Sequence, residues 1–139
     1  MQPILGIDYG RARIGLAISD ELQMLAHPLE TIAAGRDAIG RIAEIARTRK
    51  VEAVIIGLPK MMSGEHGAAA DEVVKFVDQL RKQIECPVRT WDERLTSVAA
   101  QRALHESGKN TRQMRPIIDQ VAAQMILQGY LDSRAPQQP

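Results

Sequence analysis

Residues 3–20 decide the fold of this chain and read PILGIDYGRARIGLAISD. Two short apolar runs, separated by a turn that carries Gly10, predict a pair of adjacent strands. Asp8 ends the first run, where a buried strand would hold its carboxylate at the boundary between rigid scaffold and solvent. Such a carboxylate suits a metal ligand or a catalytic base, although Asp beside Gly is also an ordinary turn former. Gly10 leaves room beside Asp8 for a phosphate or a second chain.

The rest of the chain predicts a mixed sheet covered by helices. A third apolar run at 28–33 completes an antiparallel meander, and two further buried strands are expected at 51–58 and 87–91. Apolar periodicity and capping residues predict four helices, at about 35–50, 68–84, 96–108 and from 116 onward. The expected buried stripe of the last helix consists of Ile118, Val121, Ala122, Met125 and Gly129. Helical crossovers require parallel pairing, so the fold class is α/β, with a five-stranded mixed sheet and the site at its carboxyl end.

Length and composition indicate a single small domain. The 139 residues fit one domain over 1–133, with a disordered tail over 134–139. The formal net charge of +1 excludes the global basic field that many nucleic-acid binders carry. The lone cysteine, Cys86, permits no intrachain disulfide, and no apolar run has transmembrane length. We therefore expect a cytoplasmic protein that has no membrane partner.

Three acidic residues follow predicted strand ends or lie on the flank of a helix. Asp8, Glu93 and Asp119 would repel one another if they met, so they would need cations. Mg²⁺ prefers oxygen ligands, and two such ions can promote phosphodiester hydrolysis. Each acid also has a structural alternative: Glu93 could pair with Arg94, Asp92 could be the important acid instead, and Asp119 could favour the positive end of its helix.

Motifs along nearly the whole chain resemble those of the YqgF family, also called RuvX. They are Ile7-Asp8-Tyr9-Gly10, Arg13-Ile14-Gly15-Leu16-Ala17, Gly57-Leu58-Pro59 with Gly64, Asp92-Glu93-Arg94-Leu95-Thr96, and Ile118-Asp119 through Leu127-Gln128-Gly129-Tyr130-Leu131. The family is described as Holliday junction resolvases or pre-16S rRNA nucleases with an RNase H-like fold. The resemblance implies that Asp8, Glu93 and Asp119 are catalytic carboxylates that bind Mg²⁺ or Mn²⁺, with two ions expected. This chain departs from the family pattern after Gly57-Leu58-Pro59, where Lys60-Met61-Met62-Ser63 stands in place of Leu-Asn-Met-Asp.

The resemblance implies a metal-dependent endonuclease that acts on RNA in the maturation of the 5′ end of 16S rRNA. The alternative is a Holliday junction resolvase that acts on four-way DNA. Two more distant alternatives are a nucleic-acid-binding factor with a decayed metal site and an actin-like ATPase, which would need a second such domain. The expected nucleic-acid contacts are Gly10, Arg11, Arg13, Lys60, Arg94, Arg112 and Arg115. Further candidate partners are a second copy of the chain in a weak homodimer and ribosome-associated factors.

Overall fold

A five-stranded mixed sheet forms the centre of the computed structural model, which describes residues 1–61, 63–95 and 115–134. The strands are β1 (Ile4–Tyr9), β2 (Arg13–Ser19), β3 (Ala26–Ala33), β4 (Ala53–Leu58) and β5 (Val88–Asp92). Their order in the sheet is β3-β2-β1-β4-β5. The first three pair antiparallel, whereas β1 with β4 and β4 with β5 pair parallel. The predicted sheet is therefore confirmed, and β3 begins two residues earlier than predicted.

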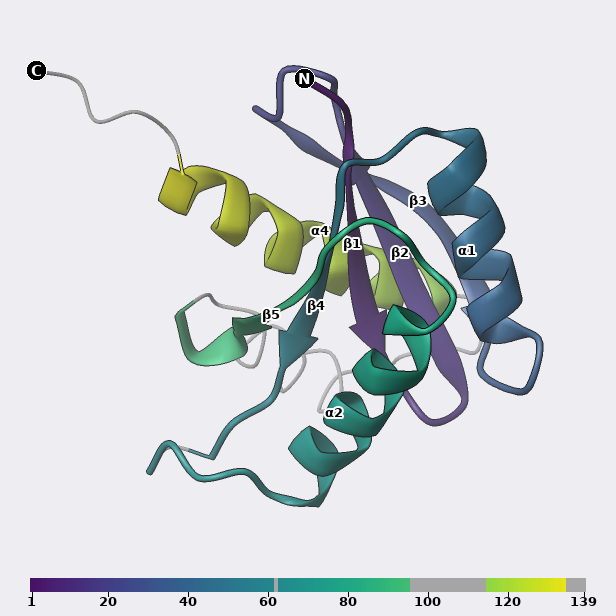
Figure 1. The fold of residues 1–139 in the computed structure, drawn as a ribbon. Helices are drawn as coiled ribbons and strands as arrows, with labels where there is room; N and C mark the ends of the chain where they lie inside the picture. Colours follow the sequence, from purple (N-terminus) through teal and green to yellow (C-terminus); the bar gives the residue numbers. More distant parts are fainter. Residues whose placement is uncertain (62, 96–114, 135–139) are drawn as a thin grey trace, which may run out of the picture.

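Helices cover both faces of this sheet. The helical elements are α1 (Ala38–Thr48), α2 (Ala68–Arg81), a short 3₁₀ turn (Glu93–Leu95) and α4 (Arg115–Arg134). Figure 1 shows α1 and α2 in front of the sheet and α4 crossing behind it. The helix predicted at 96–108 lies outside the described residues, and α4 extends through Arg134, one residue into the predicted tail. None of the helices in the described ranges is long and apolar enough to cross a membrane.

The strands divide their apolar side chains between two cores because successive residues point to opposite faces. Leu5, Ile7 and Ile56 pack toward α1 and α2. Ile4 and Ile55, one residue away, pack toward α4. This alternation fixes the face on which each later residue of β1 and β4 must lie.

The buried stripe predicted for the last helix is wrong, because Ala122 is its only buried member. The buried residues of α4 are Ala122, Ala123, Ile126, Leu127, Tyr130 and Leu131. Apolar residues surround much of this helix, so periodicity alone does not select its buried face. The sheet selects it at Gly6: a Cβ there would lie 2.7 Å from Leu127 Cβ and 3.1 Å from the Ala123 carbonyl oxygen.

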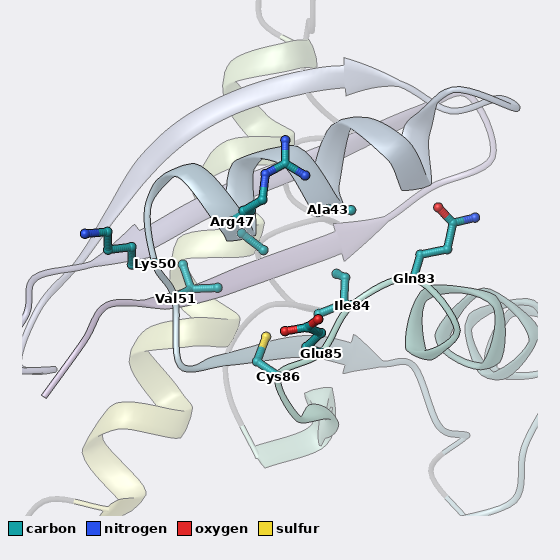
Figure 2. Close-up of a pocket in the computed structure, with 9 residues that line it drawn as sticks. Ala43, Arg47, Lys50, Val51, Gln83, Ile84, Glu85 and Cys86 are labelled. Carbon is teal, nitrogen blue, oxygen red and sulfur yellow. The ribbon is translucent and has the colours of Figure 1, made fainter.

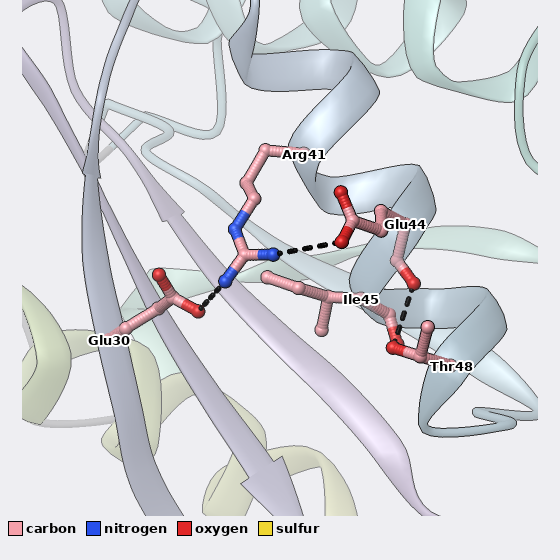
Figure 3. A network of polar contacts seen from close by, with 5 residues as sticks. All are labelled: Glu30, Arg41, Glu44, Ile45 and Thr48. Carbon is pink, nitrogen blue, oxygen red and sulfur yellow. Dashed lines mark hydrogen bonds and ion pairs between the residues drawn. The ribbon is translucent and has the colours of Figure 1, made fainter.

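A polar network fastens α1 to the outer strand β3 (Figure 3). Arg41 donates from one terminal nitrogen to Glu30 on β3 at 2.9 Å and from the other to Glu44 at 3.4 Å. Thr48 Oγ1 donates to the Glu44 carbonyl oxygen at 2.9 Å. These groups are largely exposed, so each ion pair stabilises the fold by about 1 kcal/mol at most.

Candidate active site

Asp8 points toward α4 from the carboxyl end of β1. Gly6, two residues earlier on the same strand, meets α4, and alternation therefore places Asp8 on that same face. The residue is only 7% exposed. A buried carboxylate near a strand end is a fixed acid rather than a solvated turn residue, in keeping with the functional reading of its position.

Two glycines on the neighbouring strands let the other two predicted acids approach this face. Gly15 on β2 is the register partner of Asp8, and a Cβ at Gly15 would collide with the main-chain carbonyl of Asp119 on α4. On the other side of β1, Gly57 follows Ile56, the register partner of Ile7. A Cβ at Gly57 would lie 3.0 Å from Glu93 Oε2. Asp8 therefore lies between Gly15, which is covered by Asp119, and Gly57, which is covered by Glu93.

The two adjacent acids after β5 have different surroundings. Glu93 is 4% exposed, and burial, with a smaller contribution from the charge of Asp92, raises its pKa from 4.5 to about 7. Asp92 accepts hydrogen bonds from Arg94, including Nη2 to Oδ2 at 2.7 Å, and these hold its pKa below the usual value. Glu93 is therefore the buried acid on the α4 face, whereas Asp92 forms an ion pair beside it.

Asp119 forms an ion pair across the site. Arg13, at the start of β2, donates from Nε to Asp119 Oδ2 at 2.7 Å, and the side chains are 37% and 19% exposed. Among the described residues, no three His, Cys, Asp or Glu side chains are close enough to form an assembled metal cluster. Asp8, Glu93 and Asp119 thus lie on one face and at one end of the sheet, and Asp119 forms an ion pair with Arg13.

The structure gives three of the predicted nucleic-acid contacts other interactions within the protein. A Cβ at Gly10 would lie 2.6 Å from the Arg13 carbonyl oxygen, so Gly10 is required by the tight turn between β1 and β2. Arg11 pairs with Glu72 on α2 at 2.7 Å and remains 78% exposed. Because Glu72 belongs to α2, this pair lies toward the face opposite Asp8. Arg94 pairs with Asp92, as described above.

Of the remaining predicted contacts, Lys60 lies in the loop after β4 and Arg115 lies in α4. Lys60 pairs with His66 in an isolated β-bridge that closes this loop. Gly64 has a φ of +90° there and faces the Arg94 guanidinium, which brings the loop beside the 3₁₀ turn that carries Glu93. Arg115 is the first residue of α4. Arg112 lies outside the described residues.

Three hollows of the described surface adjoin α1 and α2, on the face of the sheet opposite Asp8. One, of about 370 Å³, lies between the ends of α1 and α2, beside the residues that lead into β4 and β5 (Figure 2). It is lined by Ala43, Ala46, Arg47, Lys50, Val51, Gln83, Ile84, Glu85 and Cys86. Burial raises the pKa of the Cys86 thiol, which lowers its reactivity. Two others, of about 350 and 290 Å³, adjoin Tyr9 and Arg11.

Two contributors to the site were missed by the sequence reasoning. The first is the pair of strand glycines, Gly15 and Gly57, whose position inside apolar strands is itself a signal of close approach by another segment. The second is the ion pair of Arg13 with Asp119, which joins residues 106 positions apart. No local pattern identifies that pair.

The sheet order, together with acids at the carboxyl end of β1 and after β5, defines an RNase H-like α/β domain. The structure is similar to Thermus thermophilus RuvC in complex with a Holliday junction substrate, with a TM-score of 0.57, 18% identity and coverage of 96% of each chain. It is also similar to the fowlpox virus Holliday junction resolvase, with a TM-score of 0.53, 14% identity and coverage of 94% of this chain and 99% of that one. At these identities the likeness establishes the fold.

Within this class, the chain belongs to the RuvX family. The profile of that family, described as Holliday junction resolvase, matches residues 2–133. A relative from Chloroflexus aggregans is 49% identical over 96% of this chain and 95% of its own length. One from Acetivibrio thermocellus is 46% identical over 94% of this chain and 96% of its own length. Both are named "Putative pre-16S rRNA nuclease". The family resemblance predicted from the motifs is therefore confirmed.

Proposed function

We propose that this protein is a divalent-metal-dependent endonuclease that cleaves RNA during maturation of the 5′ end of 16S rRNA. The observation that carries the proposal is the pair of buried carboxylates, Asp8 and Glu93, on the α4 face at one end of the sheet, with Asp119 adjoining them. The names of the relatives support the choice of rRNA precursor as substrate.

The residues present fit a Mg²⁺ or Mn²⁺ ion. All three donors are carboxylates, which these hard cations prefer, and the glycines on either side of Asp8 let Asp119 and Glu93 approach its face of the sheet. Burial disfavours the charged form of Glu93, so a cation would supply the compensating charge. When bound, one or two such ions stabilise charge on the phosphoryl group and lower the pKa of water. Asp8, Glu93 and Asp119 are the residues that would hold them.

The protein side chains then have separate tasks. Asp8 and Glu93 extend from the sheet and from the turn after β5, so their carboxylates are fixed before substrate arrives. Asp119, on the helix above Gly15, completes the site and orients the attacking water. Arg94, beside the 3₁₀ turn that carries Glu93, contacts a backbone phosphate, which sets register without reading bases.

Holliday junction resolution is the second candidate, favoured by the family description and by the likeness in fold to two resolvases. A resolvase must cut two strands of a symmetric junction, which requires two sites in a stable dimer. It must also hold four duplex arms, and a net charge of +1 provides little surplus for that contact. We therefore rank it below RNA cleavage.

The test offers both substrates to one enzyme preparation. A labelled 16S rRNA precursor and a labelled four-way DNA junction are incubated with Mn²⁺ or with excess EDTA. We expect Mn²⁺-dependent cuts in the RNA that exceed symmetric nicking of the junction. Glu93→Gln should lose this cleavage. Asp92→Asn is its matched control, because it removes the neighbouring carboxylate, which forms an ion pair with Arg94. Paired junction cuts with intact RNA would reverse the ranking, and robust cleavage in EDTA would exclude a metal-dependent mechanism.

A further inference from the structure

Arg13 and Asp119 are the two members of the site that neutralise each other. The pair joins the start of β2 to the first turns of α4, at 2.7 Å between Nε and Oδ2. Arg13 lies two residues before Gly15, so it shares the α4 face with Gly15 and Asp8. With a side chain 37% exposed, Arg13 is more open to solvent than its 19% exposed partner.

The guanidinium uses only part of its bonding capacity in this pair. Nε donates to Asp119, whereas the two terminal nitrogens donate to no acceptor in the described parts of the chain. A guanidinium with terminal nitrogens open to solvent can grip a phosphate through two parallel hydrogen bonds. The same group repels a divalent cation that approaches the carboxylate it already holds.

We propose that Arg13 and a divalent cation compete for the Asp119 carboxylate, so that cation binding releases Arg13 to a phosphate of the substrate. This inference rests on the proposed function and adds a positioning role for Arg13. In the cation-free protein, the pair keeps Asp119 neutralised and keeps Arg13 from serving as a full phosphate contact. In the loaded protein, the cation takes over Asp119, and the guanidinium faces the incoming strand.

The exchange makes cation and RNA binding mutually reinforcing. If the cation frees Arg13, it tightens RNA binding, and by linkage RNA tightens cation binding by the same factor. If the role of Arg13 were purely structural, its removal would have the opposite effect on cation affinity. An arginine that merely holds Asp119 in place would, when removed, loosen Asp119 and weaken the cation site.

The test measures binding rather than cleavage. Mn²⁺ affinity is measured by titration calorimetry on the full chain for wild type, Arg13→Gln, Arg13→Lys and Arg41→Gln. Binding of a fluorescent 12-nucleotide oligouridylate is followed by anisotropy in EDTA and in Ca²⁺. Arg41→Gln is the matched control, because it removes an arginine of similar exposure from an ion pair on the α1 side (Figure 3).

We expect Arg13→Gln to bind Mn²⁺ about three- to tenfold more tightly than wild type, since it removes a competing ion pair. Ca²⁺ should tighten RNA binding about fivefold in wild type and at most about twofold in Arg13→Gln. Arg13→Lys, which keeps the charge, and Arg41→Gln should both retain wild-type cation affinity.

Two results would overturn the inference while leaving the nuclease proposal intact. One is an Arg13→Gln variant that binds Mn²⁺ no more tightly than wild type. The other is full coupling between Ca²⁺ and RNA in that variant. A wild-type protein that binds no divalent cation would overturn both the nuclease proposal and the exchange.

Discussion

Replacing Glu93 by glutamine should make the folded protein markedly more stable at alkaline pH and little different at pH 4.5. Burial, with the charge of Asp92, raises the pKa of Glu93 from 4.5 to about 7 in the folded chain. Between pH 4.5 and about pH 7, Glu93 keeps a proton in the folded state that it has lost in the unfolded state, so the free energy of unfolding falls as the pH rises through this range. Above about pH 7.5 the loss is complete and stability no longer depends on this group.

The size of the effect follows from the gap between the two pKa values. At about 1.4 kcal/mol per pH unit, that gap corresponds to about 3 kcal/mol as an upper limit. Glutamine matches the neutral carboxyl in shape and carries no charge to desolvate. The stability gained by Glu93→Gln should therefore be small at pH 4.5 and approach about 3 kcal/mol at pH 8.

Urea denaturation in EDTA, at several pH values from 4.5 to 8.5, measures this difference directly. The exposed Glu85 provides the control, because Glu85→Gln removes the same charge from the surface. A Glu93→Gln stability difference that is the same at pH 4.5 and pH 8 would refute the assignment of Glu93 as a buried acid with a raised pKa.

Three further predictions concern the strand glycines, the acids and the salt dependence. Gly15→Ala should destabilise the fold by about 3 kcal/mol or more in urea denaturation, because its Cβ would collide with the Asp119 main chain. Gly40→Ala is the control: a Cβ at this exposed position of α1 has nothing within 4 Å, so the variant should be more stable by about 0.5–1 kcal/mol. Asp8→Asn should abolish cleavage and leave apo stability equal or slightly higher, as thermal melts would show, since it relieves charge on a buried acid. The log–log salt slope of single-stranded RNA binding should be shallow, at about −0.7 for each of a few phosphates, and a slope steeper than about −5 would contradict a small footprint.

The sequence predicted the sheet well because its signals are local and mutually consistent. Alternation in β1 and β2, and the continuous apolar run of β4, each admit one interpretation. The buried stripe of α4 could not be predicted, because apolar residues lie on several sides of the helix. Its orientation depends on where the sheet admits a helix backbone, and that is decided by Gly6, far away in the sequence.

In the candidate site too, some features could be predicted from local sequence and others depend on the assembled fold. The positions of Asp8 and Glu93 in the fold could be predicted, because Asp8 lies at the end of one recognisable strand and Glu93 directly follows another, and the structure buries both. The role of Arg13 could not be predicted. Its position near Arg11 suggests two equivalent phosphate contacts, yet Arg11, in the turn between β1 and β2, pairs with Glu72 on α2, whereas Arg13, the first residue of β2, pairs with Asp119 on α4. Only the assembled fold distinguishes these two arginines.

The proposed nuclease depends on the buried carboxylates of the α4 face, which would hold the cation required for RNA cleavage. The most direct measurement is Mn²⁺-dependent cleavage of a 5′-labelled 16S rRNA precursor by wild type, Asp8→Asn and Asp92→Asn, with circular dichroism melts of each. We expect defined cuts by wild type and Asp92→Asn, and no cuts by a fully folded Asp8→Asn. Wild-type cleavage by a folded Asp8→Asn variant would contradict it.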